Sequence, residues 1–200
     1  MASTHSLGDS GFAHFRPNAT SYVSPAQTHA FNTPYQLSKI PAHLAARQRA
    51  FGGRGFQDHP SDAAVTSHAV RHGDVLVFAT DGVWDNLFVQ DILDIVQTEM
   101  KGVGAWVDGL DNGAEAAQGG GVERATWEEG GGQEGRRSVQ GMVAVKVAQR
   151  ARSAAGDKGR VSPFAMEVRK WYPNERWVAG KVDDVCVVVA VVVQEGFGEV

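Results

Sequence analysis

The stretch HGDVLVFATDGVWDNLFVQDILDIV, from His72 to Val96, decides the fold of this chain. Its segment from Val75 to Ala79 is a continuous apolar run, which predicts a strand that is buried on both faces. Beyond this strand, apolar residues recur at helical spacing and predict a helix that lays one stripe on the core. The residues of that stripe are Val89, Ile92, Leu93 and Val96.

Two acids, Asp81 and Asp85, stand between the predicted strand and the predicted helix. Carboxylates at the end of a buried strand are costly unless another group pairs with them, and a metal ion would do so. Gly82 follows the first acid and lets the backbone turn tightly beside it. An ordinary Asp-Gly turn would use the same residues, so the turn is the alternative to a metal site.

A second pair of acids, Asp183 and Asp184, stands directly before the apolar run from Val185 to Val193. If this run is a buried strand and an antiparallel neighbour of the first, its start lies beside the end of the first strand. The carboxylates of Asp81, Asp183 and Asp184 then converge at one rim of a sheet. Oxygen-only clusters suit Mg²⁺ and Mn²⁺, which commonly hold phosphate oxygens and activate water. We predict that Asp81 and Asp183 lie close enough to share one ion.

The composition allows one domain with a real core, because 42% of the 200 residues are hydrophobic and 21% are charged. A net charge of −4 gives no basic footprint, so we expect no nucleic-acid partner. The longest apolar run is too short for a membrane-spanning helix, so we expect no membrane span. The single cysteine, Cys186, is predicted to be buried in a strand, and it excludes a disulfide framework within one chain.

The rest of the chain predicts hairpins, a flexible insertion and two more helices. One hairpin is expected around Pro17-Asn18, and another is expected to join residues 64–70 to residues 74–80. Nearly half of the 24 glycines fall between Gly102 and Gly135. We therefore expect residues 102–138 to form a low-complexity insertion that buries little.

The two further helices follow that insertion. The first carries an apolar face, and the second begins at Ser162 as N-cap with Pro163 at its first position. The apolar face of the first comprises Val139, Val143, Val147 and Ala151. The predicted buried stripe of the second comprises Phe164, Val168 and Trp171.

Several motifs resemble one enzyme family in the correct order. GDVLVFATDGVWDN and the downstream GKVDDVCVVVAVV resemble the two C-terminal metal motifs of the metal-dependent protein phosphatase 2C family. LGDSGF, from Leu7 to Phe12, resembles the central Gly-Asp-Ser strand motif of that family. FNTPYQLS and SPFAMEVRKWYP are similar to the branch typified by the mitochondrial type 2C phosphatase. The resemblance covers most of the chain except the glycine-rich insertion.

The resemblance implies an α+β fold, part of the type 2C sandwich in which helices flank two antiparallel sheets. It implies a protein serine/threonine phosphatase that acts on phosphoproteins with Mg²⁺ or Mn²⁺, two or more ions in the intact fold. Asp81 and Asp183 match metal ligands, and Asp9 and Asp85 match acids associated with an additional metal. Asp184 and Gly82 are expected beside the ligands, and no catalytic residue separate from them is expected.

The sequence departs from the family in what it lacks. The Arg that grips the substrate phosphate and the Asp-Gly that bridges both metals belong to the family's first half, before the Gly-Asp-Ser strand. We therefore expect residues 1–200 to be the C-terminal portion of a phosphatase domain, with doubtful activity of its own. A catalytically inactive remnant that binds or regulates a partner is the alternative function. The resemblance implies a mitochondrial location, with the cytoplasm as the alternative.

Other phosphatase chemistries fail at their central residues. A haloacid-dehalogenase type needs a second acid two residues from the strand-end aspartate, where Ala79 and Val83 stand. A cysteine-dependent type needs an Arg six residues beyond Cys186, where Val192 stands. The histidines are scattered without a paired metal spacing, which favours structural or solvated roles.

Overall fold

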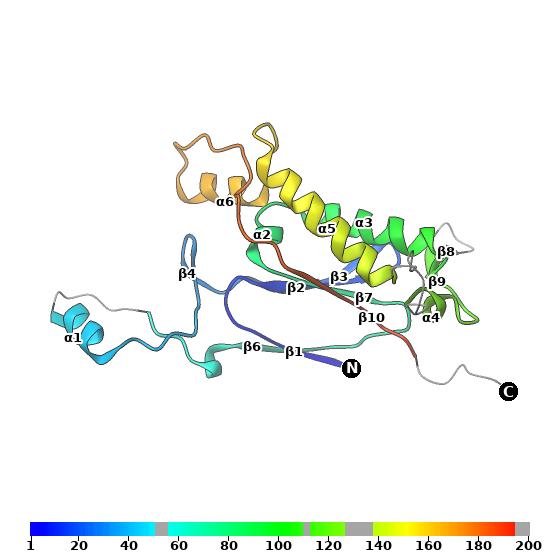
Figure 1. Ribbon diagram of the computed structural model, residues 1–200, viewed down its shortest axis with the longest axis horizontal. Helices are drawn as coiled ribbons and strands as arrows, with labels where there is room; N and C mark the ends of the chain where they lie inside the picture. Colours follow the sequence, from blue (N-terminus) through cyan, green and yellow to red (C-terminus); the bar gives the residue numbers. More distant parts are fainter. Residues whose placement is uncertain (51–55, 110–112, 127–137, 195–200) are drawn as a thin grey trace, which may run out of the picture.

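The main sheet of the computed structural model has four antiparallel strands, in the order β10-β7-β2-β3 (Figure 1). The structure describes residues 1–50, 56–109, 113–126 and 138–194. The strands of the main sheet are β2 (Gly11–Arg16), β3 (Ala19–Val23), β7 (Val75–Ala79) and β10 (Val187–Val191). The hairpin expected around Pro17-Asn18 is confirmed, because β2 pairs with β3 there and Asn18 adopts a positive φ of 59°.

The register of β7 positions the acidic segments. Ala79, the last residue of β7, lies opposite Val187 of β10 on one side and Gly11 of β2 on the other. The chain that leaves β7 therefore runs beside the chain that enters β10 and the chain that enters β2. The predicted antiparallel pairing of the strands that carry Asp81 and Asp183 is confirmed.

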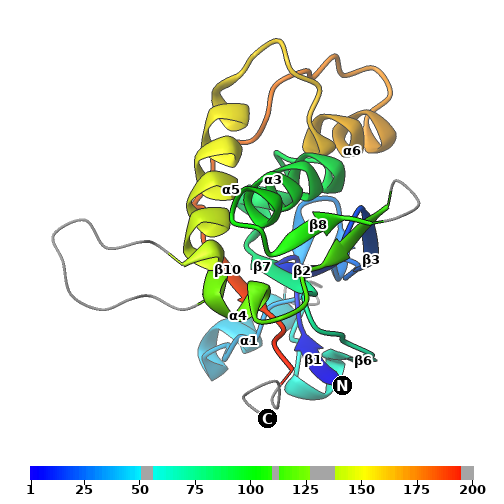
Figure 2. The same cartoon turned by 90° about the vertical axis from the view of Figure 1, so that its right-hand side faces the viewer.

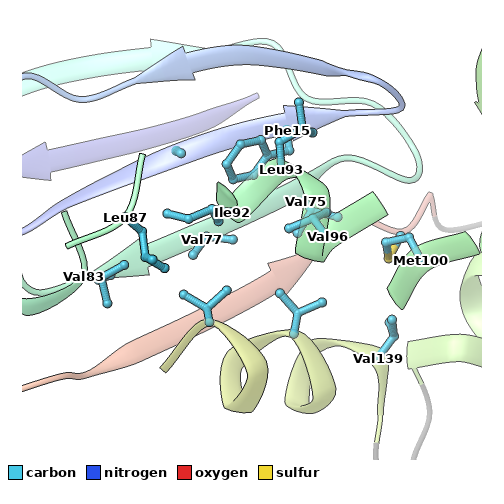
Figure 3. Packing of buried hydrophobic residues seen from close by; sticks show 14 of the residues in the cluster. Phe15, Val75, Val77, Val83, Leu87, Ile92, Leu93, Val96, Met100 and Val139 are labelled. Carbon is cyan, nitrogen blue, oxygen red and sulfur yellow. The ribbon is translucent and has the colours of Figure 1, made fainter. Parts of the chain in front are cut away.

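Helices cover one face of the main sheet (Figure 1). The chain leaves β7 through the short helix α2 (Asp81–Trp84), and α3 (Val89–Gly102) follows after a short connection. The third helix on this face is α5 (Val139–Gly156), which packs on β10 and α3. The apolar stripes predicted for α3 and α5 are confirmed, because their residues are buried except for Val89, which is partly exposed. Figure 3 shows Ile92, Leu93 and Val96 of α3 packed against Phe15, Val75 and Val77 of the sheet.

A two-stranded sheet lies on the opposite side of the main sheet from α3 and α5 (Figure 1). It pairs β1 (Ala2–Ser6) with β6 (Ala64–His68). The predicted hairpin between residues 64–70 and 74–80 is therefore wrong. Both edges of β7 are taken by β2 and β10, so β6 pairs with β1, where the hydroxyls of Thr4 and Thr66 lie 2.8 Å apart.

The glycine-rich segment is better packed than its composition predicts. Its described part forms β8 (Trp106–Asp108), β9 (Ala114–Ala116) and α4 (Gly121–Thr126), which Figure 2 shows beside α3 and α5. Trp106 is 1% exposed, and its Nε1 donates a hydrogen bond to the carbonyl of Gly73 at 2.9 Å. The expectation of poor packing is therefore wrong for part of this segment, because Ala105, Trp106, Ala117 and Val122 are buried, whereas Val103 and Val107 are exposed as expected. Residues 110–112 and 127–137 lie outside the described residues.

The remaining elements are small. They are β4 (Thr28–Ala30), β5 (Thr33–Pro34), α1 (Ala42–Ala50), the 3-10 helix η1 (Pro60–Asp62) and α6 (Pro163–Trp171). The predicted start of α6 is confirmed, because Ser162 Oγ accepts a hydrogen bond from the backbone N–H of Ala165 at 3.0 Å. Of the predicted buried stripe of α6, Val168 is buried and Phe164 is partly buried, but Trp171, the last residue of the helix, is half exposed. Among the described helices, none combines the length and the apolar composition that a membrane span needs.

The last strand is an edge strand rather than a buried one. Within the described residues, β10 pairs only with β7, and its residues alternate between exposed and partly buried. Cys186 lies just before β10 and is exposed, so the prediction of a buried cysteine is wrong. The apolar run gave no sign of this, because a strand buried on one face and a fully buried strand can both be rich in valine.

Candidate metal centre

Thr80 ties the end of β7 to the segment that enters β10. Its backbone N–H donates to the carbonyl of Cys186 at 3.2 Å, and its Oγ1 donates to the carbonyl of Asp184 at 3.1 Å. The same Oγ1 accepts a hydrogen bond from the backbone N–H of Cys186 at 3.0 Å. These bonds extend the β7–β10 pairing toward the acids, so Asp81 and Asp183 are held on adjacent backbones.

Gly82 is required by close approach. A Cβ atom at this position would collide with the backbone carbonyl oxygen of Asp184. Gly82 does not adopt a positive φ angle. The fold therefore does not need glycine here for a tight turn, as the sequence had suggested. The absence of a side chain instead lets the start of α2 lie against the segment that carries Asp183.

Three carboxylates converge on the ammonium group of Lys181. Its Nζ lies 2.9 Å from Asp81 Oδ2, 3.0 Å from Asp85 Oδ2 and 3.0 Å from Asp183 Oδ2. Two oxygens that contact one nitrogen at hydrogen-bond distance lie within about 6 Å of each other. The predicted approach of Asp81 and Asp183 at one rim of the sheet is therefore confirmed. Asp85 joins the same cluster.

Asp9 and Asp184 relate to this cluster in different ways. Burial raises the pKa of the Asp9 carboxyl, and the negative charge of Asp81 raises it further, which places Asp9 near the cluster. The prediction that the Asp184 carboxylate joins the cluster is wrong: its side chain is exposed, and in the described structure only its backbone makes the contacts. Its N–H donates to Asp183 Oδ1 at 2.9 Å, and its carbonyl accepts from Thr80.

The cluster carries more negative than positive charge. Burial raises the pKa of Asp85, and the hydrogen bond and charge of Lys181 offset that rise only in part. Asp183 is more exposed, and the hydrogen bond from Lys181 lowers its pKa. Burial alone would lower the pKa of Lys181, but its hydrogen bonds to the carboxylates outweigh this and raise it. Three carboxylates contact one ammonium group, and the excess of negative charge favours the binding of further cations.

Asn86 fixes the backbone of Lys181, and its role was not recognised from the sequence. It is 0% exposed, and its Nδ2 donates to the carbonyls of Gly82 at 2.9 Å and Lys181 at 2.8 Å. In return, the backbone N–H of Lys181 donates to Asn86 Oδ1 at 2.9 Å. Gly180 makes room for this exchange, because a Cβ there would collide with Asn86 Oδ1.

Sequence reasoning also overlooked Lys181, although a signal was present. Lys181 and Gly180 belong to the GKVDD segment, and Asn86 ends the DGVWDN segment. A lysine two residues before an acidic pair is a natural counter-charge. A single asparagine beside two turn-forming acids is weak evidence, because Asn is common in turns for local reasons.

The donor atoms fit a hard divalent cation in type. All of them are carboxylate oxygens, which Mg²⁺ and Mn²⁺ prefer. The point that three of the carboxylates share is taken by the Lys181 ammonium. In the parts of the chain that the structure describes, no three His, Cys, Asp or Glu side chains are spaced to hold a metal ion.

Comparisons with known proteins give a consistent set of relatives, although no protein-family model matches the chain. The chain is 32% identical over 186 residues to "Probable protein phosphatase 2C 80" of Arabidopsis thaliana, which covers 93% of the chain and 33% of that relative. It is 30% identical over 191 residues to "Protein phosphatase PTC7 homolog" of Homo sapiens, covering 96% of the chain and 49% of the relative. The chain thus spans half or less of these relatives.

A solved structure has the same fold. It is the X-ray structure of the photosystem II phosphatase PBCP, with a TM-score of 0.63 over 95% of this chain and 58% of that one. The two sequences are 23% identical. The structural match confirms the predicted α+β architecture of antiparallel sheets flanked by helices.

Proposed function

Since most of this chain is homologous to the protein phosphatases 2C, we propose that its acidic rim is the metal-binding part of a protein serine/threonine phosphatase site. One observation carries the proposal. Carboxylates from two distant segments, Asp81 with Asp85 and Asp183, converge on a single cation, the ammonium of Lys181. A simple solvated turn would not bring three acids this close together, because neighbouring carboxylates repel each other.

The proposed roles are those that the resemblance to the family implies. Asp81 and Asp183 are ligands of one ion, and Asp85 and Asp9 serve an additional, more weakly held ion. A bound Mg²⁺ or Mn²⁺ supplies Lewis acidity toward phosphate oxygens and lowers the pKa of water. Gly82 and the backbone of Asp184 hold the two acidic segments in contact.

The proposed substrate is a phosphoprotein carrying phosphoserine or phosphothreonine. The names of the relatives, which are protein phosphatases, support this choice. We place the phosphate-gripping Arg and the metal-bridging Asp outside residues 1–200, so that this chain is the C-terminal portion of the active domain. This placement is supported by the fact that the chain matches only 33% and 49% of the length of these two relatives. The mitochondrial location implied by the resemblance stays a prediction.

The test is Mn²⁺ binding by the 200-residue chain, measured by calorimetric titration. Asp81→Asn should weaken Mn²⁺ binding by about a hundredfold, because it replaces an anionic ligand with a neutral amide. The matched control is Asp108→Asn, an equivalent change at an exposed aspartate that pairs only with Lys101 in the described structure. Equal Mn²⁺ affinity in the two variants would contradict the proposal.

A further inference from the structure

Lys181 occupies the point at which the cluster would bind a metal ion. Its Nζ is within 3.0 Å of three carboxylates at once, the distance of charge-assisted hydrogen bonds. The side chain is only 21% exposed, so its charges are screened less than those of a surface pair. The ammonium is therefore the counter-ion that keeps three close acids compatible with the fold.

A metal ion and this ammonium exclude each other. Mg²⁺ holds oxygen ligands at about 2.0–2.1 Å, whereas the oxygens here surround nitrogen at 2.9–3.0 Å. The carboxylates of Asp81 and Asp183 would have to move inward to coordinate an ion. Two cations at the centre of one small cluster would also repel each other.

The Lys181 side chain is able to leave while its backbone stays. Asn86 holds the main-chain N–H and carbonyl of Lys181, so the strand entry does not depend on the ammonium. The four-carbon stem of lysine is flexible, and its ammonium is readily hydrated. The ring centroid of Phe164 lies 5.6 Å from Nζ, which adds a weak cation–π contact to the position inside the cluster.

We propose that Lys181 is an internal counter-ion that competes with the divalent metal for Asp81, Asp85 and Asp183. This inference rests on the proposed function, because it concerns how the same site takes up its metal. Without metal, Lys181 neutralises part of the cluster and stabilises the rim. Metal binding displaces the ammonium into solvent, so the residue sets the metal concentration at which the site loads.

The first test compares the metal affinity of Lys181→Met with that of the unaltered chain. Methionine keeps most of the stem and removes the charge, so Mn²⁺ should bind about tenfold more tightly. In EDTA the same variant should melt at a lower temperature, because three carboxylates lose their counter-ion. The control is Lys170→Met, which removes an exposed lysine paired with Glu167 and should change neither quantity.

A double variant covers the case in which Lys181→Met does not fold without metal. Adding Asp85→Asn restores the net charge of the cluster and keeps the two main ligands, Asp81 and Asp183. This double variant should fold in EDTA and should still bind Mn²⁺ more tightly than Asp85→Asn alone.

The second test uses the unaltered chain. An amine-acylating reagent, read by mass spectrometry, should modify Lys181 about tenfold faster with saturating Mn²⁺ than in EDTA, because three charge-assisted hydrogen bonds are lost. Lys170 should react at the same rate in both conditions and serves as the internal standard.

The outcomes separate the two proposals. If the unaltered chain binds Mn²⁺ and Asp81→Asn weakens binding, but Lys181→Met binds no more tightly, the counter-ion proposal is overturned and the metal site stands. Acylation of Lys181 that does not respond to bound Mn²⁺ overturns it as well. If neither the unaltered chain nor Lys181→Met binds Mn²⁺, the metal site itself fails, and the competition fails with it.

Discussion

The two ends of strand β7 each carry aspartate, and their surroundings differ. Before the strand, Asp74 is buried and fully partnered: His14 Nε2 lies 2.7 Å from Asp74 Oδ2, and the N–H of Arg71 donates to the same oxygen at 2.8 Å. After the strand, Asp81 is partly exposed and shares one ammonium group with Asp85 and Asp183.

The difference separates an acid with a full set of partners inside the fold from the acids that we propose bind a metal ion. Asp74 has its own cationic and backbone partners, including Arg16 Nε at 3.4 Å, so it needs nothing more. The acids beyond β7 outnumber their cation and remain open to solvent, an arrangement that costs stability unless something else binds. Ionisable groups perturbed by burial and by neighbouring charges cluster at functional sites, which supports the proposal for the acids beyond β7.

The largest expected effect is at the balanced end. Asp74→Asn should lower the free energy of unfolding by about 3 kcal/mol, because it leaves His14 and the N–H of Arg71 with a weaker, neutral partner. Urea unfolding of the two proteins measures this. A loss no larger than that of Asp108→Asn would show that the two ends of β7 do not differ as described.

The second effect concerns the support of the acidic rim. Asn86→Ala should cost about 2 kcal/mol, because it leaves the buried carbonyl of Gly82 and the partly buried carbonyl and N–H of Lys181 without their partner. It should also weaken Mn²⁺ binding, since the segment that carries Asp183 is then less well positioned. Unfolding and Mn²⁺ titration of the same sample test both parts. Unchanged metal affinity would limit Asn86 to a structural role.

A smaller effect is expected for an acid at the open end. Asp85→Asn should change the free energy of unfolding in EDTA by less than about 1 kcal/mol, because its pairing with Lys181 is partly exposed. Burial, which raises the pKa of Asp85, already works against its charged form. This substitution is chemically the same as Asp74→Asn. A loss of unfolding free energy as large as that of Asp74→Asn would therefore overturn the comparison between the two ends of β7.

The smallest expected signal is turnover by the chain alone. With Mn²⁺, residues 1–200 should hydrolyse p-nitrophenyl phosphate little or not at all, because the proposed mechanism needs two ions at a fixed separation and we place the Asp that bridges them outside these residues. A version extended by the N-terminal half that we propose for the domain should be active, metal-dependent and inactivated by Asp81→Asn. Robust Mn²⁺-dependent turnover by the short chain would contradict the proposed placement of the missing groups.

Local pattern was enough to predict several parts of the fold. The apolar run of β7, the stripes of α3 and α5 and the capped start of α6 depend on neighbours within a few turns, so they are visible in the sequence. The meeting of Asp81 with Asp183 needed only one further assumption, that their strands are antiparallel neighbours. That assumption holds.

Predictions failed where the outcome depended on distant partners. The closeness of β6 and β7 in the sequence suggested that they pair, but β2 and β10 occupy the two edges of β7. Glycine content suggested a loose insertion, but Trp106 finds a buried place beside Gly73. Lys181 was overlooked because its partners Asp81 and Asp85 lie about a hundred residues away in the sequence.

Residue types alone showed that carboxylates at residues 81, 85 and 183 stand where β7 ends and where β10 begins, and that a glycine stands where the two backbones touch. That these three carboxylates surround one ammonium group, that of Lys181, depends on the tertiary structure. The physical reason is the pairing of β7 with β10, which joins segments that are remote in the chain and fixes their register. A cluster of charges depends on distances of a few ångströms across that pairing, and no local pattern encodes them.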